Sequence, residues 1–190
     1  TEFQVDDLAL RTEPLQISAD VVSEGQSSLD WEAVLAYGLL GTWLVGTLGL
    51  LIRATVQYLR FAIRLHSSPE TTDQATIDKV LRACDATGCR RRPTLKEVDD
   101  LTVPAVFGVL RHTVCLPAGT VNELSPEEFR WVLKHEIAHI TRRDSLLLSI
   151  ALLVRACHWF NLLAWLAVSR LRNHMEQAAD DTALRSESPP

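Results

Sequence analysis

The sequence lacks the features of a nucleic-acid-binding or disulfide-stabilised protein. Its formal net charge is −5 over 190 residues, so it offers no basic surface to a phosphate backbone and we expect no direct nucleic-acid partner. Its four cysteines follow neither C-x-x-C nor zinc-finger spacing, which predicts reduced, buried thiols. It also lacks a basic-then-apolar signal sequence at its start, and we expect a piece of a longer protein.

One long stretch lacks charge altogether. The segment Ala33–Ile52 runs for twenty residues without a charged side chain, which is the length of a helix that crosses a hydrocarbon core of about 30 Å. Trp31 and Tyr58 lie near its ends, where amphipathic rings prefer to sit. We therefore predict a transmembrane helix over 31–52, in contact with the lipid bilayer. Small residues recur at every fourth position and would let another helix approach closely, namely Gly38, Thr42 and Gly46.

The charges on the two sides of this helix differ in sign. Residues 1–30 carry seven acids and one base, whereas residues 53–64 carry three arginines and no acid. The positive-inside tendency then places the acidic segment 1–30 outside the cytoplasm and residues 53–190 on the cytoplasmic side. We expect a membrane protein whose functional part faces the cytoplasm.

Residues 53–190 combine helical and strand-like patterns, which predicts an α+β domain. A helix is expected after residue 70, where Thr71 and Gln74 fit a capping box and Gly88 would end the helix. Short runs punctuated by proline and glycine then predict edge strands at Leu95–Val98, Val103–Leu110 and Thr113–Leu116.

The clearest helix start in the chain lies at Ser125. Ser125 and Glu128 fit an S-x-x-E capping box, and Pro126 occupies the first helical position. A helix is therefore predicted from Pro126 to about Arg142.

This helix carries the sequence HEIAH, with His135 and His139 on one face. Two imidazoles one turn apart can both bind a tetrahedral zinc ion. Glu136 then lies beside the metal, where a carboxylate can take a proton from water. The motif predicts a catalytic zinc site with Glu136 as the base. A chance match on an ordinary polar helix is the alternative.

A catalytic zinc needs a third protein ligand and one open position. The glycine and third histidine of metzincin enzymes are lacking at the required spacing. Downstream, Glu176 and Asp180 are four residues apart on an expected helix, so one can bind the metal while the other supports a histidine ligand. We predict Glu176 as the ligand and Asp180 as the residue that orients a zinc-bound histidine, with His174 as the rival ligand.

The segment 145–169, which links the histidines to Glu176, is apolar. Basic residues flank both of its ends, which are therefore expected to stay cytoplasmic: Arg142, Arg143, Arg170 and Arg172. Its two apolar runs are each too short to span a bilayer, and polar residues separate them: Ser145–Val154 and Leu162–Val168. We predict a helical hairpin that dips into the inner membrane face or lies along it. A wholly soluble core hairpin is the alternative.

Three stretches of the chain occur in a specific order and spacing: PAVFGVLRHTVCLPAG, LSPEEFRWVLKHEIAHITRRD and RLRNHMEQAADDTAL. Over about Leu95 to Leu184 the chain resembles the BlaR/MecR-type membrane metallopeptidases of bacteria. The resemblance implies a mainly helical, zincin-like (gluzincin) fold with a small sheet. It implies one Zn2+ bound by His135, His139 and Glu176, with Glu136 as the catalytic base. It also implies the bacterial inner membrane as the location, and a transcriptional repressor or the protease itself as the substrate.

The chain departs from this family in two places. The family usually has a proline where the chain has His112, which leaves the local turn open. The chain also lacks an S-x-x-K acylation motif, so the β-lactam sensing of the best-known members is not expected here. A more distant similarity, to prenyl-processing and heat-shock membrane endopeptidases, leaves that class as an alternative.

These features together predict a membrane-anchored zinc endopeptidase that acts at the cytoplasmic membrane face. An extended substrate is expected to pair with the predicted strand made of Val103, Pro104, Ala105, Val106, Phe107, Gly108, Val109 and Leu110. The residue that steadies the oxyanion stays open among His158, Arg172 and His174. Two other functions are alternatives: a non-catalytic membrane transducer with a zinc-stiffened fold, and a soluble secreted zincin, with which the uncharged segment conflicts.

Overall fold

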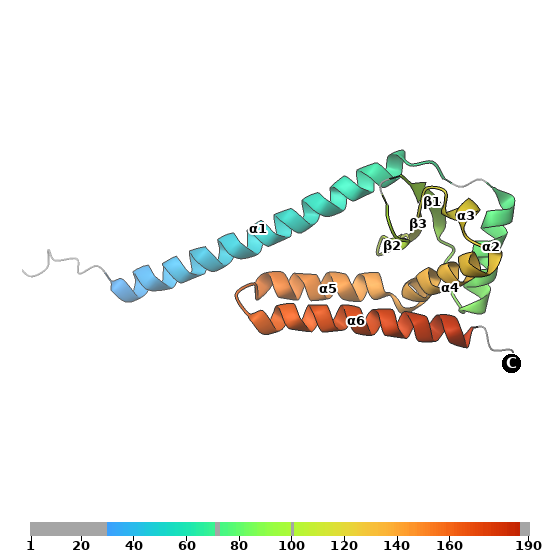
Figure 1. Ribbon diagram of the computed structural model, residues 1–190. Coiled ribbons are helices and arrows are strands. Elements are labelled where there is room, and N and C mark those ends of the chain that lie inside the picture. Colours follow the sequence, from blue (N-terminus) through green and yellow to red (C-terminus); the bar gives the residue numbers. More distant parts are fainter. Residues whose placement is uncertain (1–29, 71–72, 100, 187–190) are drawn as a thin grey trace, which may run out of the picture. The chain divides into compact units, whose positions relative to one another are not determined.

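A computed structural model describes residues 30–70, 73–99 and 101–186 (Figure 1). The chain divides into two compact units, residues 1–40 and 41–190. The elements in chain order are α1 (Trp31–Ser67), α2 (Gln74–Ala86), β1 (Thr94–Val98), β2 (Ala105–Phe107), β3 (Thr113–Pro117), α3 (Thr120–Glu123), α4 (Pro126–Arg142), α5 (Asp144–Cys157) and α6 (Leu162–Arg185). The predicted acidic segment lies outside the described residues except for Asp30.

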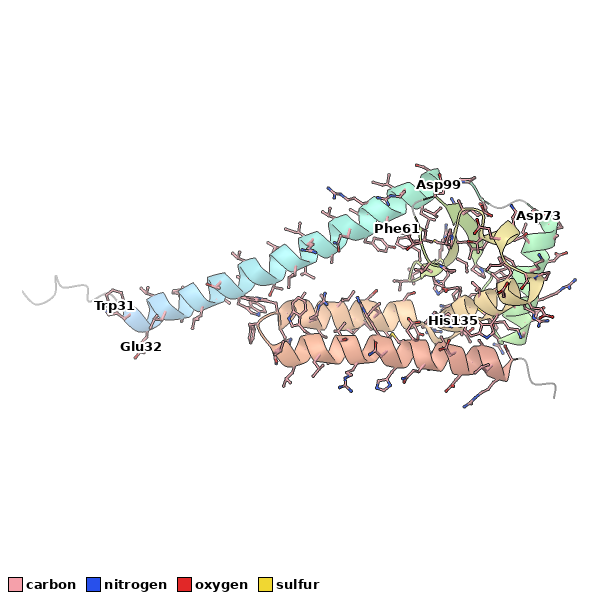
Figure 2. All side chains as sticks on the ribbon, viewed as in Figure 1. Trp31, Glu32, Phe61, Asp73, Asp99 and His135 are labelled. Atoms are coloured by element: carbon pink, nitrogen blue, oxygen red, sulfur yellow. The ribbon has the colours of Figure 1, made fainter. Side chains whose placement is uncertain are left out.

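Helix α1 is the only helix in the described part of the chain that is long and apolar enough to cross a membrane. It has 37 residues and therefore continues well past the predicted boundary at residue 52. Aromatic contacts explain the extension, because Tyr58 stacks on Phe107 at 4.8 Å between ring centroids and Phe61 lies 4.9 Å from the same ring. The second half of α1 thus packs against the sheet through its aromatic side chains. Figure 2 shows side chains projecting along the whole helix.

The sheet has three strands in the order β1-β3-β2. Strands β1 and β3 are parallel, and β2 pairs with β3 in the antiparallel sense. The prediction of a strand over 103–110 is wrong outside Ala105–Phe107. Pro104 lacks an N–H for the ladder. Gly108 has φ +99° in a turn where a Cβ would overlap the carbonyl of Arg111, so the strand must end there.

Helix α2 has its N-cap two residues after the predicted one. Asp73 is the N-cap, and its carboxylate accepts hydrogen bonds from the backbone N–H and the hydroxyl of Thr76 at 2.9 and 2.6 Å. The expected capping box with Thr71 is therefore wrong, and Thr71 itself lies outside the described residues. Gly88 does end the helix, with φ +68°, and lets Cys89 N–H donate to the carbonyl of Cys84 at 2.8 Å.

Helix α4 confirms the predicted bounds and cap. Ser125 accepts from the N–H of Glu128, and the Glu128 carboxylate accepts from the N–H of Ser125. Leu133 and Ile137 on this helix are fully buried in the main core, against α2 and the sheet. Burial of this face fixes the rotation of α4, and so fixes where its histidines point. All four cysteines are free, as predicted, although Cys157 is only half-buried.

Helices α5 and α6 form the predicted hairpin and lie side by side (Figure 1). Helix α6 runs without a break for 24 residues, far beyond the apolar limb expected to end at Val168. Its second half packs on α4, where Glu176 and Asp180 lie beside His135. Helix α6 therefore joins the apolar hairpin directly to the acidic residues near its C-terminal end.

Candidate metal centre

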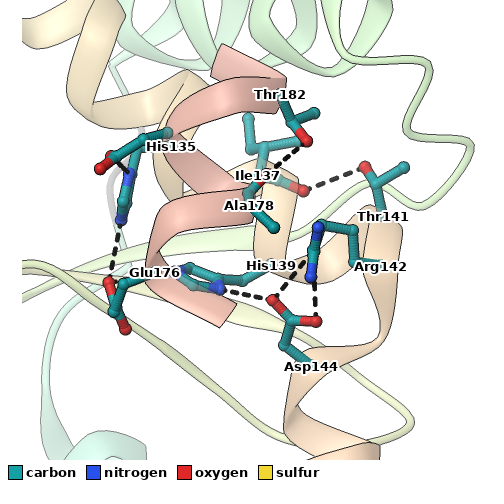
Figure 3. Close-up of polar contacts among 10 residues, drawn as sticks. His135, Ile137, His139, Thr141, Arg142, Asp144, Glu176, Ala178 and Thr182 are labelled. Atoms are coloured by element: carbon teal, nitrogen blue, oxygen red, sulfur yellow. Dashed lines mark hydrogen bonds and ion pairs between the residues drawn. The ribbon is translucent and has the colours of Figure 1, made fainter. Parts of the chain in front are cut away.

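Helices α4 and α6 bring two imidazoles and one carboxylate together (Figure 3). The Nε2 atoms of His135 and His139 lie 3.5 and 3.9 Å from Oε2 of Glu176. One donor atom from each residue lies within 4.8 Å of the other two. The two histidines share a face of α4 because they are one helical turn apart.

This donor set fits a small divalent cation. Ligands at 2.0–2.1 Å from a tetrahedral ion are separated from one another by about 3.4 Å, close to the observed distances from Glu176. Two imidazole nitrogens and one carboxylate oxygen are donors that zinc prefers. Glu176 is 63% exposed, so the cluster is open on one side and could accept a fourth ligand.

Asp144 holds His139 in place, a contact that the sequence reasoning missed. Its Oδ2 lies 2.8 Å from Nδ1 of His139, and the Arg142 guanidinium Nε is 3.3 Å from the same oxygen. Asp144 is buried and begins α5 directly after Arg143, whose φ of 60° is the only positive value at a non-glycine residue in the described part of the chain. With its Nδ1 occupied in this way, His139 presents Nε2 to Glu176.

Asp180 lies beside His135 much as Asp144 lies beside His139, but its contact is less well aligned. Its Oδ1 is 2.9 Å from Nδ1 of His135, yet the approach is too oblique for a hydrogen bond, and that buried nitrogen has no aligned acceptor among the described residues. Trp131 stacks on the His135 ring at 5.5 Å between centroids. Packing on Trp131 and proximity to Asp180 thus both restrain His135.

Glu136 points into the same site from the buried side. Only 7% of its surface is exposed. Burial raises the pKa of Glu136 to about 7; the nearby Glu176 also raises it, and His135 lowers it. A carboxyl group with a pKa near neutrality can both accept and return a proton at physiological pH.

A pocket of about 590 Å³ opens over these residues. It is lined by His135, Glu136, His139 and Glu176, and by the first half of the predicted substrate strand, Val103 to Val106. The other half, Phe107 to Leu110, lines a separate pocket of about 510 Å³ beside α1. Of the three oxyanion candidates, Arg172 lines the first pocket, whereas His158 and His174 do not. His174 also lies outside the His135–His139–Glu176 cluster.

The described part of the chain thus combines a helix long and apolar enough to cross a membrane with a His/His/Glu cluster that could hold a metal ion. Residues 9–189 match the model of a peptidase family described as BlaR1 peptidase M56. The chain therefore belongs to the BlaR1 peptidase M56 family.

Individual relatives match over shorter stretches. The methicillin resistance mecR1 protein of Staphylococcus aureus is 20% identical over 153 residues, which are 80% of this chain and 26% of that protein. The regulatory protein BlaR1 of Bacillus licheniformis is 32% identical over 83 residues, 44% of this chain and 14% of that protein. A protease HtpX homolog of Persephonella marina is 49% identical over 53 residues, 26% of this chain and 18% of that protein. The chain thus spans about a quarter or less of the length of these relatives.

Proposed function

We propose that the chain is the catalytic part of a membrane-anchored zinc metalloendopeptidase with a gluzincin-like arrangement. The observation that carries this proposal is the position of Glu176. It comes from a different helix than the histidines, yet its carboxylate lies within 4 Å of both Nε2 atoms. A chance HEIAH match on a polar helix would have no reason to attract a distant carboxylate.

His135, His139 and Glu176 would hold the ion, and Asp144 and Asp180 would orient the two histidines. When bound, zinc would supply a positive charge that lowers the pKa of water and polarises a carbonyl group. Outer residues such as Asp144 act by fixing the ring tautomer and direction, which raises the basicity of the ligating nitrogen.

Glu136 would move the proton. As the oxygen of a water molecule attacks the scissile carbonyl carbon, a carboxylate oxygen of Glu136 takes a proton from that water. When the C–N bond breaks, Glu136 returns this proton to the leaving amine nitrogen. In the metal-free protein, burial raises the pKa of Glu136 to about 7, and a bound cation would favour the carboxylate form that accepts the proton.

Strand β2 offers a place for the substrate backbone. Ala105, Val106 and Phe107 pair with β3 on one side only, since β2 is at the edge of the described sheet. The part of the chain at Val103–Val106 also lines the pocket. An extended peptide that adds itself to this edge would lie across the pocket mouth, with its backbone hydrogen-bonded to β2.

The charge pattern supports a location of the catalytic part at the cytoplasmic face of the bacterial inner membrane. Residues 31–52 would span the bilayer, residues 1–30 would lie outside the cytoplasm and residues 53–190 inside. The substrate would be a protein in a signalling pathway, such as a transcriptional repressor or the peptidase itself. The names of two relatives, a regulatory protein and a methicillin resistance protein, support a signalling role.

A second assignment has one observation in its favour. The 49% identity to a protease HtpX homolog over 53 residues would suit a general membrane endopeptidase with the same chemistry. Cleavage of an unrelated unfolded protein such as casein, at a rate comparable to that of a repressor, would favour this assignment.

Replacing Glu136 with glutamine tests the catalytic role. The variant keeps the shape of the side chain but cannot accept a proton, so we expect full zinc content and no cleavage of a protein substrate. Retained cleavage would remove Glu136 as the base. Zinc binding without cleavage in the wild-type protein would instead favour the non-catalytic transducer.

A further inference from the structure

The turn between α5 and α6 is bonded to the first half of α1. The indole Nε1 of Trp43 donates to the carbonyl of Cys157 at 2.7 Å, and the indole Nε1 of Trp159 donates to the carbonyl of Trp43 at 3.4 Å. The Trp159 ring lies so close to Gly46 that a Cβ there would overlap it. A glycine is therefore required at residue 46 for the ring to seat.

Several carbonyls and N–H groups of this turn find partners within the protein. Cys157 is the last residue of α5, so its carbonyl has no acceptor role within that helix and receives the Trp43 indole instead. The carbonyl of Trp159 accepts from the indole of Trp165 at 2.9 Å, and the Asn161 side chain caps the N–H of Leu163 at 2.9 Å. A turn in water has no need of indole donors, because water satisfies its carbonyls. Inside hydrocarbon every such group must be satisfied by protein.

The lengths of two elements, α1 and α6, agree on one depth. Trp43 lies at the middle of the uncharged segment Ala33–Ile52 and ten residues from Arg53, which is about 15 Å of helix. From Leu162 to Arg170, the first arginine of α6, is eight residues, about 12 Å. Both values are close to half of a hydrocarbon core of about 30 Å. With the arginines at the inner surface, the turn reaches the bilayer centre.

The outward faces of the hairpin are mainly apolar, and the exposed polar side chains of Ser149, His158 and Asn161 each contact nearby backbone groups. Among the described residues, the large exposed hydrophobic side chains of the hairpin are Leu146, Leu147, Ile150, Leu153, Val154, Phe160, Leu162, Leu163, Trp165 and Leu166. The only guanidinium between Asp144 and Ser169 belongs to Arg155, and it lies over the Trp165 ring at 4.5 Å. An apolar surface of this extent on both helices suits acyl chains rather than water.

We propose that the α5–α6 hairpin is a half-crossing membrane element whose turn, residues 157–161, seats in the Gly46 notch of α1 at the centre of the bilayer. The proposal rests on the membrane placement of α1 given above. Gly46 is one of the small residues predicted to let another helix approach α1. In this chain the Trp159 ring of the α5–α6 turn occupies the space beside it. Helix α5 begins at Asp144, and α6 continues from the turn to Glu176. The contact between the turn and α1 therefore connects α1, through these two helices, to two residues of the metal centre.

The depth of the turn is measured with a nitroxide on Phe160→Cys, in the full chain with its native cysteines replaced by alanine and reconstituted in liposomes. The same label on Leu146→Cys, near the base of the hairpin, is the matched control. We expect Phe160 to be accessible to oxygen and to have lost access to a water-soluble nickel complex, whereas Leu146 reports a depth near the interface. Equal depths, or nickel access at Phe160, would overturn the proposal.

The seat is tested by filling the notch. Gly46→Leu is compared with Gly49→Leu, where a Cβ would meet nothing within 4 Å. Gly46→Leu should shift the label on Phe160 to a different depth and mobility, and Gly49→Leu should leave both unchanged. If neither variant changes the depth and mobility of the label, or if both variants change them equally, the turn has no specific contact site at Gly46. If Gly46→Leu dissociates a dimer and leaves the label unmoved, the notch belongs to a second copy.

These readouts need neither zinc nor cleavage. They should be the same in the Glu136→Gln chain, so failure of the seat and failure of the proposed peptidase activity are separate results.

Discussion

Replacing Asp144 with alanine should weaken zinc binding although Asp144 is not expected to touch the metal. Its carboxylate lies 2.8 Å from Nδ1 of His139 and is 7% exposed, so the contact is short, charged and shielded from water. Loss of such an outer partner typically weakens metal binding by about 10- to 100-fold, or about 1.4 to 2.7 kcal/mol. Because Asp144 is buried and well aligned, we expect Asp144→Ala to fall within this range.

The assay is competition with a zinc chelator at fixed pH, with far-ultraviolet circular dichroism to verify folding. Asp144→Asn keeps an acceptor oxygen but loses the charge, so its zinc affinity should lie between those of the wild type and Asp144→Ala. Asp181→Ala removes an exposed acid from α6 and is the matched control. Wild-type zinc affinity in a folded Asp144→Ala protein would refute the role given to Asp144.

Three further outcomes are expected. Asp180→Ala should weaken zinc binding less than Asp144→Ala, because Asp180 is 49% exposed and poorly aligned; an equal loss in chelator competition would contradict this. In the metal-free protein the folded-state pKa of Glu136 is raised from 4.5 to about 7. Between these pH values the folded state binds more protons than the unfolded state. The free energy of unfolding should therefore fall as pH rises toward and through 7, and should be lower at pH 8 than at pH 5. This loss amounts to at most about 3 kcal/mol and should be absent in Glu136→Gln. Ser125→Ala should lower the free energy of unfolding by about 1 kcal/mol through loss of the cap, with zinc affinity unchanged.

Local chemistry explains which parts of the structure could be predicted. The start of α4 depends on Ser125, Pro126 and Glu128, all within one turn, so the sequence alone was sufficient. The spacing of His135 and His139 likewise fixes their shared face whatever the tertiary structure.

The features that were missed depend on backbone geometry or on distant packing. Asp144 reaches His139 because Arg143 adopts φ 60°, a conformation that no propensity assigns to arginine. The only available signal was an acid five residues after the second histidine, next to a helix end. The predicted strand was too long because a turn at Gly108 overrides an apolar run. Helix α1 outlasts its apolar segment because Phe107, far along the chain, packs on Tyr58 and Phe61.

Zinc content of the purified chain and of its Glu176→Ala variant, with Asp181→Ala as a control for acid removal on the same helix, tests the assembled site most directly. The wild-type and control proteins should each retain one zinc ion per chain through dialysis, and folded Glu176→Ala should lose it. A Glu176→Ala chain that keeps its zinc as firmly as the wild type would show that the two histidines find their third ligand elsewhere.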